Sequence, residues 1–232
     1  YLLVGAVLTA ANGSLGRAQI GANPAFSCIE NIQPSVIRKE GAAQVVSDIY
    51  LVCTGGTPYP AGSAILPSTI EVVPNTKIAN RVFNGNLSDA LLIIDDAYPS
   101  NPNPSSALRN PLAGSPQDLC QTGPDGCPMT ATGNPSGNPG GDYDGTGGHY
   151  NVFEGFYVGG NAVVFSVPLD PPGPSGSLTI RIPNIRVDVT QLVELLPIQT
   201  FISIFGGLAP AISNAEPVVA NAMTGFNFAQ TP

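Results

Sequence analysis

The chain has little charge, a single histidine and no tryptophan. Charged residues make up 10% of its 232 positions, against about 25% in an average globular domain. Eight Lys and Arg stand against sixteen Asp and Glu, for a net charge of −8, and only Arg38 and Lys39 are adjacent bases. Nucleic acid requires clustered positive charge, so we expect no nucleic-acid partner. The surface must consist mainly of Ser, Thr, Asn, Gln, Gly and Pro, a composition that proteins outside cells tolerate.

Motifs for common catalytic chemistry are also missing. The sequence contains no G-x-S-x-G turn for a nucleophilic serine, no phosphate-binding loop and no dinucleotide fingerprint. His149 is the only imidazole that is available as a base. Asp95 and Asp96 are adjacent at the end of a predicted strand, where neighbouring side chains point to opposite faces, so they make a poor acid–base pair. We therefore predict that the protein is not an enzyme.

Four cysteines, Cys28, Cys53, Cys120 and Cys127, indicate two disulfides. Their spacing fits no zinc site, and the single histidine cannot complete one. Cys120 and Cys127 bracket the segment QTGPDG, whose Gly and Pro residues let the chain reverse, and a Cys28–Cys53 bond would join the first strands. Disulfides form in oxidising compartments, so this pairing predicts a secreted protein. Four buried free thiols are the alternative.

Short runs rich in Val, Ile, Phe and Tyr recur along the chain, separated by Gly, Pro, Asn or Asp. β-branched and aromatic residues favour strands, and in SLTIRI the residues Leu178, Ile180 and Ile182 share one face. No segment of helical length has apolar residues at helical spacing, although 190–196 has the composition for one or two helical turns. The pattern predicts an all-β fold, an antiparallel β-sandwich of jelly-roll or immunoglobulin-like type. Its expected strands are 42–53, 68–73, 90–95, 151–158, 161–169, 177–182, 184–193 and 199–206.

Residues 97–148 differ in composition from the rest of the chain. They hold nine of the 24 prolines and ten of the 27 glycines, with Arg109 as their only base. A loop of this length is unusual in a compact domain, and the cysteine pair within it indicates that it is ordered. It has too few apolar residues for a core of its own. We therefore expect three parts: a segment 1–11, a flexible tether 12–25 and a β-sandwich domain 26–232 with 97–148 as a loop excursion.

One polar cluster in this excursion has the composition of a cation site. In GGDYDGTGGHYN, Asp142 and Asp144 are separated by one residue and followed by Gly145, as at the start of a calcium-binding loop. The closing carboxylate is not in its usual place, because Phe153 stands there and Glu154 follows it. Calcium at Asp142 and Asp144 is therefore a possible cofactor, and a glycine-rich turn is the alternative.

The uncharged segment YLLVGAVLTAA (1–11) allows four interpretations. It has the length of a signal-peptide core, with a small-residue cleavage site after Ala18, so 1–18 is the candidate signal-peptide remnant. As a membrane helix, eleven residues would cover only about half of the ~30 Å hydrocarbon layer, so we expect no membrane span. The segment also suits the first strand of its own sandwich. The fourth interpretation is a donor strand that inserts into a neighbouring subunit.

The donor-strand interpretation accounts for the segment and its flank together. An extended stretch of eleven residues is about 35 Å long, and apolar residues on both faces suit a strand that is buried on both sides. The polar, glycine-rich stretch that follows suits a tether. A strand supplied to the open edge of the next copy links subunits head to tail, and a contact of this kind that does not close gives a filament. The expected polymerisation residues are Leu2, Leu3, Val4, Gly5, Val7 and Leu8.

This layout resembles that of chaperone–usher-type pilin subunits. They too have an apolar N-terminal extension, a β-sandwich and a disulfide between early strands, which residues 1–11, Cys28 and Cys53 match here. Separately, IYLVCTGGTP (49–58), SDALLIIDD (88–96) and IRIPNIRVDV (180–189) are similar to stretches of uncharacterised secreted β-rich bacterial proteins. That second similarity brings no function with it.

The resemblance implies a structural subunit of an extracellular filament or pilus on the cell surface. Its partners would be identical copies in a homopolymer joined by donor-strand exchange. The alternative is a monomeric secreted adhesin or carbohydrate-binding module that uses the 97–148 loop to contact a surface glycan or cell. Filaments or isolated particles in negatively stained material distinguish the two.

Overall fold

The computed structural model describes residues 23–96, 117–120, 125–135, 141–159, 161–192 and 196–225. These residues form strands and no α-helix, which confirms the all-β prediction. None of them belongs to a helix long and apolar enough to cross a membrane. The longer strands are β1 (Ser27–Glu30), β2 (Ser35–Arg38), β4 (Ile49–Gly55), β6 (Pro67–Pro74), β9 (Leu87–Ile94), β12 (Val152–Tyr157), β13 (Val163–Pro168), β14 (Gly173–Ile182), β16 (Pro197–Phe205) and β18 (Val218–Met223).

Shorter strands extend this framework at its edges and loops. They are β3 (Gln44–Val45), β5 (Ala64–Ile65), β7 (Lys77–Ile78), β8 (Val82–Phe83), β10 (Leu119–Cys120), β11 (Met129–Thr130), β15 (Arg186–Asp188) and β17 (Ala211–Ile212). β5 pairs with β11, and β3, β15 and β7 form a separate three-stranded sheet. The turn at the start of the 190–196 segment follows β15 and does not continue as a helix within the described residues.

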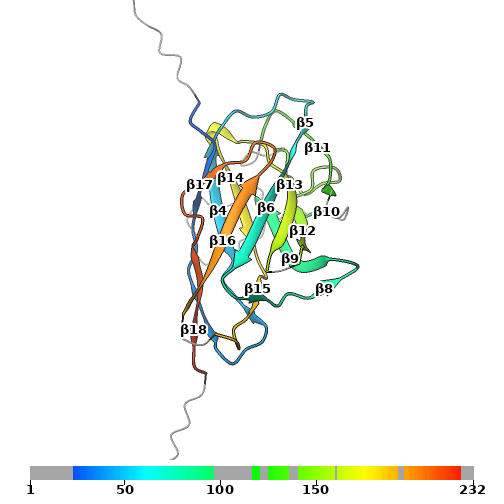
Figure 1. Cartoon of the computed structure of the whole chain (residues 1–232). Helices are drawn as coiled ribbons and strands as arrows, with labels where there is room; N and C mark the ends of the chain where they lie inside the picture. Colours follow the sequence, from blue (N-terminus) through cyan, green and yellow to red (C-terminus); the bar gives the residue numbers. More distant parts are fainter. Residues whose placement is uncertain are drawn as a thin grey trace, which may run out of the picture.

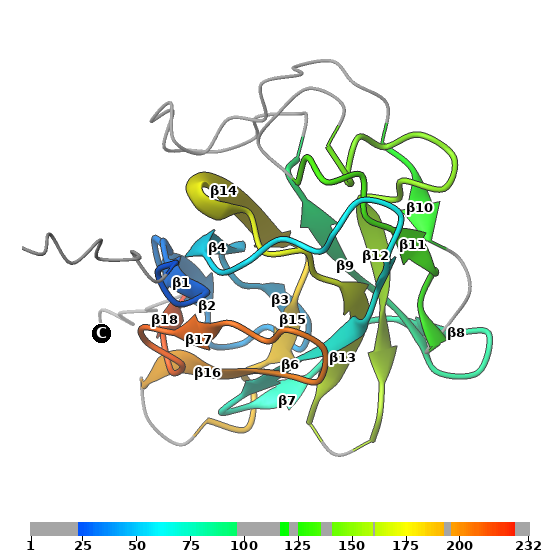
Figure 2. The same ribbon diagram turned by 90° about the horizontal axis from the view of Figure 1, so that it is seen from above.

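One curled sheet makes up most of the molecule. Its strand order is β17-β1-β4-β14-β9-β12-β13-β6-β16-β18-β2, with β8 and β10 attached to β9 and β12 (Figure 1). Viewed from one end, the strands follow one another round a common interior (Figure 2). The sheet is mixed, because β1–β17, β10–β12 and β2–β18 are parallel pairs. The expectation of a purely antiparallel sheet is therefore wrong at these three pairs.

Alternation of apolar and polar side chains explains why these segments form strands with one buried face. In β4, Ile49 and Leu51 are buried while Tyr50 and Val52 are only partly so. Successive side chains of a strand point to opposite faces, so a period of two places every second residue in the interior. β6 and the second half of β14 show the same pattern. The sheet therefore has one apolar face, and curling buries that face against itself.

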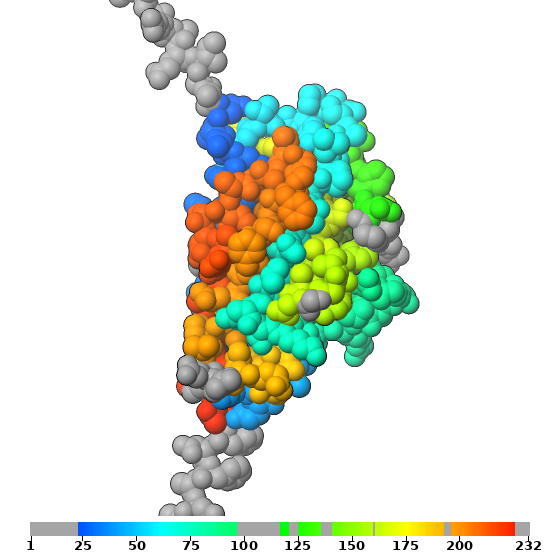
Figure 3. All heavy atoms as spheres, in the orientation of Figure 1, coloured from blue at the N-terminus to red at the C-terminus, as the bar shows by residue number. Residues whose placement is uncertain are grey.

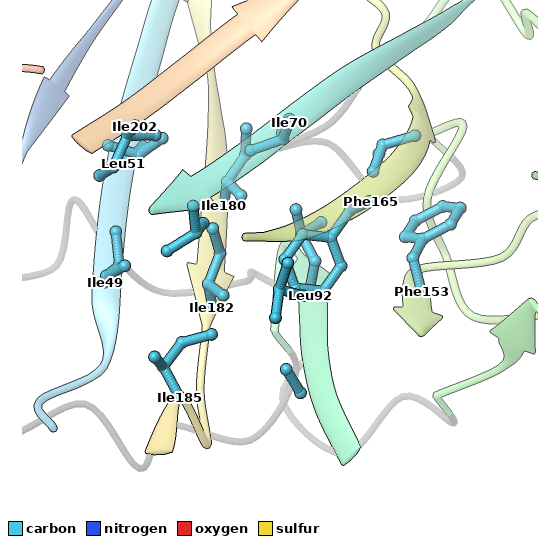
Figure 4. Close-up of a cluster of buried hydrophobic side chains, with 14 of the residues drawn as sticks. Ile49, Leu51, Ile70, Leu92, Phe153, Phe165, Ile180, Ile182, Ile185 and Ile202 are labelled. Carbon is cyan, nitrogen blue, oxygen red and sulfur yellow. The ribbon is translucent and has the colours of Figure 1, made fainter. Parts of the chain in front are cut away.

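The core lies between the two arms of the curled sheet. Figure 4 shows side chains from several strands of the sheet in this cluster, among them Leu51 of β4 and Ile202 of β16. Burying a large aliphatic or aromatic side chain contributes about 1.5–3 kcal/mol, so this cluster is the main source of stability. Its largest fully buried members include Ile49, Leu51, Ile70, Leu92, Phe153, Phe165, Ile180, Ile182 and Ile185.

Both predicted disulfides are present. Cys28 and Cys53 are directly opposite each other in the antiparallel pair β1–β4, so their bond joins two neighbouring strands. Cys120 and Cys127 are bonded across a separation of seven residues, with their Cα atoms 5.7 Å apart. The two disulfides indicate an oxidising, extracellular environment.

The described parts of the 97–148 excursion are built into the domain. β10 extends the main sheet beside β12, and β11 pairs with β5. Met129 and Tyr143 are buried in the same core cluster as the strands of the main sheet. The segment thus adds to the existing core, which agrees with its low apolar content.

Candidate functional site

The predicted polymerisation segment lies outside the described residues. This holds for Leu2, Leu3, Val4, Gly5, Val7 and Leu8. What the structure describes is the place where the chain enters the domain and the strands around it. Those strands form a distinct site, which we call the seam: β1 and β2 on one side, and β17 and β18 on the other.

The chain enters and leaves the domain at opposite ends of the seam. Residues before β1 (blue) lie at one end of the long axis, and β18 (red) runs to the other (Figure 1). The first end is tied down by a hydrogen bond of 2.7 Å from the Gly56 N–H to the Pro24 carbonyl. At the other end, the Gly225 N–H donates to both carboxylate oxygens of Glu40 at 3.1 Å. Both ends of the described chain are therefore fixed against the domain.

Two stretches of the chain, β1 to β2 and β17 to β18, run parallel to each other along the seam. The stretch that adjoins the rest of the main sheet differs between the two halves. In the first half, Cys28 of β1 is paired with Ile212 of β17, and β1 is the strand next to β4. In the second half, Val36 of β2 is paired with Asn221 of β18, and β18 is the strand next to β16. The seam thus connects one arm of the curled sheet to the other.

A pocket separates the two halves of the seam. It has a volume of about 340 Å³ and is lined by Glu30, Asn31, Ile32, Pro34, Asn214, Pro217 and Val218. Proline cannot donate a ladder hydrogen bond and is confined to strand starts and edges. Pro34 stands immediately before β2 and Pro217 immediately before β18. The stretch between β1 and β2 and the stretch between β17 and β18 are therefore not paired with each other, and the gap between these two stretches forms the pocket.

The sequence contains a signal for this pocket that the strand pattern alone does not reveal. The pattern N-x-x-P occurs three times in the sequence, and two of the copies, NIQP at 31–34 and NAEP at 214–217, stand directly before a strand. The third copy, NPNP at 101–104, lies outside the described residues. The two copies near the first and last strands indicate two kinks of the same kind. Their meeting across the seam depends on the tertiary fold.

Apolar side chains point outward along the seam. Ile29 is 64% exposed, Val36 69% and Met223 55%. Their inward-facing neighbours Cys28 and Ile37 are buried, so strand alternation orients them to the outside. These side chains place exposed apolar groups along the seam, beside a pocket whose lining is mainly polar. Exposed apolar surface next to a concave site is typical of interaction sites.

Glu30 is the one charged group in the pocket lining. Its carboxylate accepts hydrogen bonds from the Ser213 hydroxyl and, at 3.2 Å, from the Asn214 N–H. Partial burial favours the neutral acid, but these hydrogen bonds outweigh it and hold the pKa of Glu30 below its ordinary value. The carboxylate therefore stays ionised and fastens the end of β1 to the 213–214 loop.

The outer side of β2 is partly occupied by the segment that follows it. Within the described part of the chain, β2 ends the order of the main sheet and has β18 as its ladder partner. On its other side, the Arg38 N–H donates to the Gln44 side-chain oxygen at 3.3 Å, and the Arg38 carbonyl accepts from the Gly41 N–H at 3.1 Å. β18 fills the position beside β16, so β2 is the outermost strand of this half of the seam.

The two residues of the predicted calcium loop have different environments. Asp142 is fully buried, and one of its carboxylate oxygens accepts hydrogen bonds of 2.6 Å from the backbone and hydroxyl of Thr132. Asp144 accepts from the backbone and hydroxyl of Thr146 in a local turn and lies 3.5 Å from His149. Among the described residues, no group of three or more His, Cys, Asp or Glu is arranged to hold a metal ion.

Asp142 has a closer relationship with a residue that the sequence did not indicate. Asp170, also fully buried, follows β13 and hydrogen-bonds the Asp142 carboxyl group. Its other oxygen accepts from the Tyr59 N–H at 2.8 Å, and the Tyr143 hydroxyl accepts from the Asp170 N–H at 2.8 Å. Burial and the neighbouring Asp142 raise the pKa of Asp170 to about 8. The pair therefore shares a proton at neutral pH, and it holds the excursion against β13.

Asp95 and Asp96 have separate structural partners. Asp95 ends β9 with a positive φ of 45° and accepts hydrogen bonds of 2.8 Å from the backbone and hydroxyl of Thr179. Asp96 forms an ion pair with Arg181, which also binds Asp48 at 2.7 Å. The two carboxylates thus fix β9 and β14 together.

Comparisons of the chain with protein-family models, with curated proteins and with solved structures gave no significant match.

Proposed function

We propose that the protein is a structural subunit of an extracellular filament or pilus. Residues 1–11 of one copy add as a strand to the outside of the seam of the next copy, and repetition of this contact joins subunits head to tail. The domain itself is inferred to be a β-sandwich of jelly-roll or immunoglobulin-like type whose two faces are the arms of the curled sheet. No catalytic role is proposed for it.

The observation that supports this proposal is the geometry of the seam. The chain enters the domain at one end of the long axis and the seam continues to the other, so a contact along it propagates in one direction. A heterologous contact that does not close gives a fibre. The exposed apolar residues Ile29 and Val36 offer burial to an apolar strand, and the pocket between them, whose lining is mainly polar, offers hydrogen-bonding groups to the backbone of that strand.

Burial of the apolar segment is the main favourable term in such a contact. Residues 1–11 contain five large apolar side chains, each worth about 1.5–3 kcal/mol when fully buried. Their sum is on the order of 10 kcal/mol, before the cost of ordering the tether and of association is subtracted. Ladder hydrogen bonds add roughly 1 kcal/mol each. The side chains are Leu2, Leu3, Val4, Val7 and Leu8.

Deleting residues 1–11 tests the proposal. The shortened protein should remain soluble and folded, fail to form filaments in negatively stained preparations, and bind a free peptide of residues 1–11. A second variant, Val36→Asp, should block assembly from the acceptor side while leaving the strand intact. Val158→Asp is the matched control, because Val158 is also exposed, at 56%, but lies beyond the end of β12.

Two results would overturn the proposal. One is filament formation by the shortened protein at the rate of the full chain. The other is equal loss of assembly in Val36→Asp and Val158→Asp, which would point to general solubility rather than to the seam.

A further inference from the structure

A second pocket, away from the seam, gathers positive charge on an acidic protein. It has a volume of about 270 Å³ and is lined by Ala43, Ala79, Arg81, Asp89 and Arg186. Two guanidinium groups and one carboxylate give it a net charge of +1, in a chain whose net charge is −8. It lies where the β8–β9 hairpin, which projects from the body at the right of Figures 1 and 3, meets β15 and the end of β7.

Side-chain hydrogen bonds of Asn80 and Asn184 join the segments that carry the lining residues. Asn80 donates to Asp89 at 2.8 Å and to the Asn184 carbonyl at 2.7 Å, and its own oxygen accepts from the Arg186 N–H at 2.8 Å. Asn184 in turn donates to the Asp89 carbonyl at 2.7 Å. Residues in such a network have few other arrangements, so β9 and β15 hold Asp89 and Arg186 in a fixed relative position.

Asn184 is also held in an unusual backbone conformation. Its φ is +64°, a region that non-glycine residues rarely adopt. Asn is among the residues that tolerate this region best. Here it allows the Asn184 side chain to reach β9 directly before Arg186 enters β15.

The guanidinium groups are incompletely neutralised by the protein. Arg186 Nε forms an ion pair with Asp89 Oδ2 at 3.6 Å, beyond hydrogen-bond distance, while Asp89 Oδ1 already accepts from the Asn80 side chain and the Arg81 N–H. The described residues place no carboxylate within ion-pair distance of the Arg81 guanidinium. By contrast, Arg181 is engaged by two aspartates. Arg81 therefore lacks a neutralising carboxylate among the described residues, and Arg186 has a single one without a hydrogen bond to it.

The chemistry of the lining selects among anions. Arginine binds a carboxylate through paired hydrogen bonds. Asp89 accepts hydrogen bonds from hydroxyl groups, so an anionic ligand that also carries hydroxyls suits the lining better than one without them. Phe83, which is 37% exposed, stands in β8 two residues after Arg81 and is not one of the lining residues. An aromatic ring there suits the apolar face of a sugar.

We propose that this pocket binds an acidic saccharide, a uronate residue of an extracellular polysaccharide. The carboxylate of the uronate lies between Arg81 and Arg186, its hydroxyls donate to Asp89, and its ring rests near Phe83. Neutral sugars lack the carboxylate that the arginines recognise, and inorganic phosphate lacks the ring and the spread of hydroxyls that a sugar offers. The site is separate from the seam, so it gives a filament subunit a means of attaching to a matrix.

Calorimetric titration of the full-length protein with a galacturonate trisaccharide at low salt tests the assignment. The fully methyl-esterified trisaccharide keeps the hydroxyls and rings but masks the carboxylates, and it should bind at least about tenfold more weakly, as expected for loss of a charged hydrogen bond. Arg81→Gln should weaken binding of the acidic trisaccharide by a similar factor. Lys77→Gln is the matched control, because it removes an exposed base outside the pocket and should leave the affinity unchanged.

Four results would overturn the assignment. They are no heat with the acidic trisaccharide up to about 10 mM, a range that covers weak sites, equal binding of the esterified form, equal loss in Arg81→Gln and Lys77→Gln, and equal or tighter binding of a triglutamate peptide. The last would identify the ligand as an acidic peptide. Because the readout is binding to single subunits, it is independent of whether filaments form.

Discussion

The buried Asp142–Asp170 pair should make the protein less stable as the pH rises from 4 to 8. The pKa of Asp170 is about 8 in the folded protein, because burial and the neighbouring Asp142 disfavour a second charge, against 3.8 for an ordinary aspartate. The folded state therefore holds a proton that the unfolded state has released across this range. Stability from this proton is complete below about pH 4 and is lost as the pH approaches 8.

The size of the effect follows from the difference between the two pKa values. The pKa of Asp170 is about 4 higher in the folded than in the unfolded protein, and each pKa unit corresponds to about 1.4 kcal/mol, so the loss of folding free energy has an upper limit near 6 kcal/mol. Movement of the excursion and entry of water reduce the penalty of a second buried charge, so we expect a decrease of about 3 kcal/mol between pH 4.5 and 8.5. Glu30 and Asp188, whose pKa values are lowered by hydrogen bonds, act in the opposite direction only near and below pH 4.

Urea unfolding followed by circular dichroism over this pH range measures the effect. Asp170→Asn is the diagnostic variant, because an amide accepts from the Tyr59 N–H and donates to Asp142 without a titrating proton. It should remove most of the decrease and be more stable than the wild type at pH 8.5. Asp144→Asn is the control and should keep the wild-type pH dependence. Wild-type stability that is constant or rises between pH 4.5 and 8.5 would refute the reasoning.

The same variants test the predicted calcium site. Calcium held by Asp142 and Asp144 should raise the unfolding midpoint of the wild type at pH 9, above the pKa of Asp170 of about 8. Asp144→Asn should abolish that increase. Absence of any shift with calcium in excess over chelator would leave the pair as a proton site only.

Three further changes have defined outcomes. Gly5→Leu should slow filament assembly in sedimentation assays although it adds apolar surface, because a mid-strand glycine marks close backbone approach; faster assembly would contradict this. Arg181→Met should lower the free energy of unfolding by about 2 kcal/mol, since it leaves Asp48 and Asp96 without their shared cation in a partly exposed site; a neutral result in urea titrations would show that the network adds little. Gly155→Ala should cost about 1–3 kcal/mol, because its new methyl group would meet a side-chain carbon of β13 at 2.6 Å; unchanged stability would mean that the sheet yields there.

Local patterns in the sequence predicted most of the long strands and both disulfides. The segments at 68–73 and 199–206 were recognisable because β-branched and aromatic residues fill them, and β6 and β16 cover nearly the same ranges. Strand propensity is a property of the residues themselves, so it needs no knowledge of the fold. β18 escaped prediction because VVANAM contains Ala and Asn, which have weak strand preference.

Pairing between distant segments depended on the tertiary structure. The parallel seam joins strands almost two hundred residues apart in a 232-residue chain, Asp142 meets Asp170 from a different element, and Arg81 shares a pocket with Arg186. No local pattern specifies such partners, because strand propensity and alternation are the same for every possible neighbour. The sequence by itself determined an extracellular all-β protein with an apolar first segment. The curling of the sheet decided which side chains meet. Only the packing of the complete core distinguishes one arrangement of the strands from the other possible arrangements.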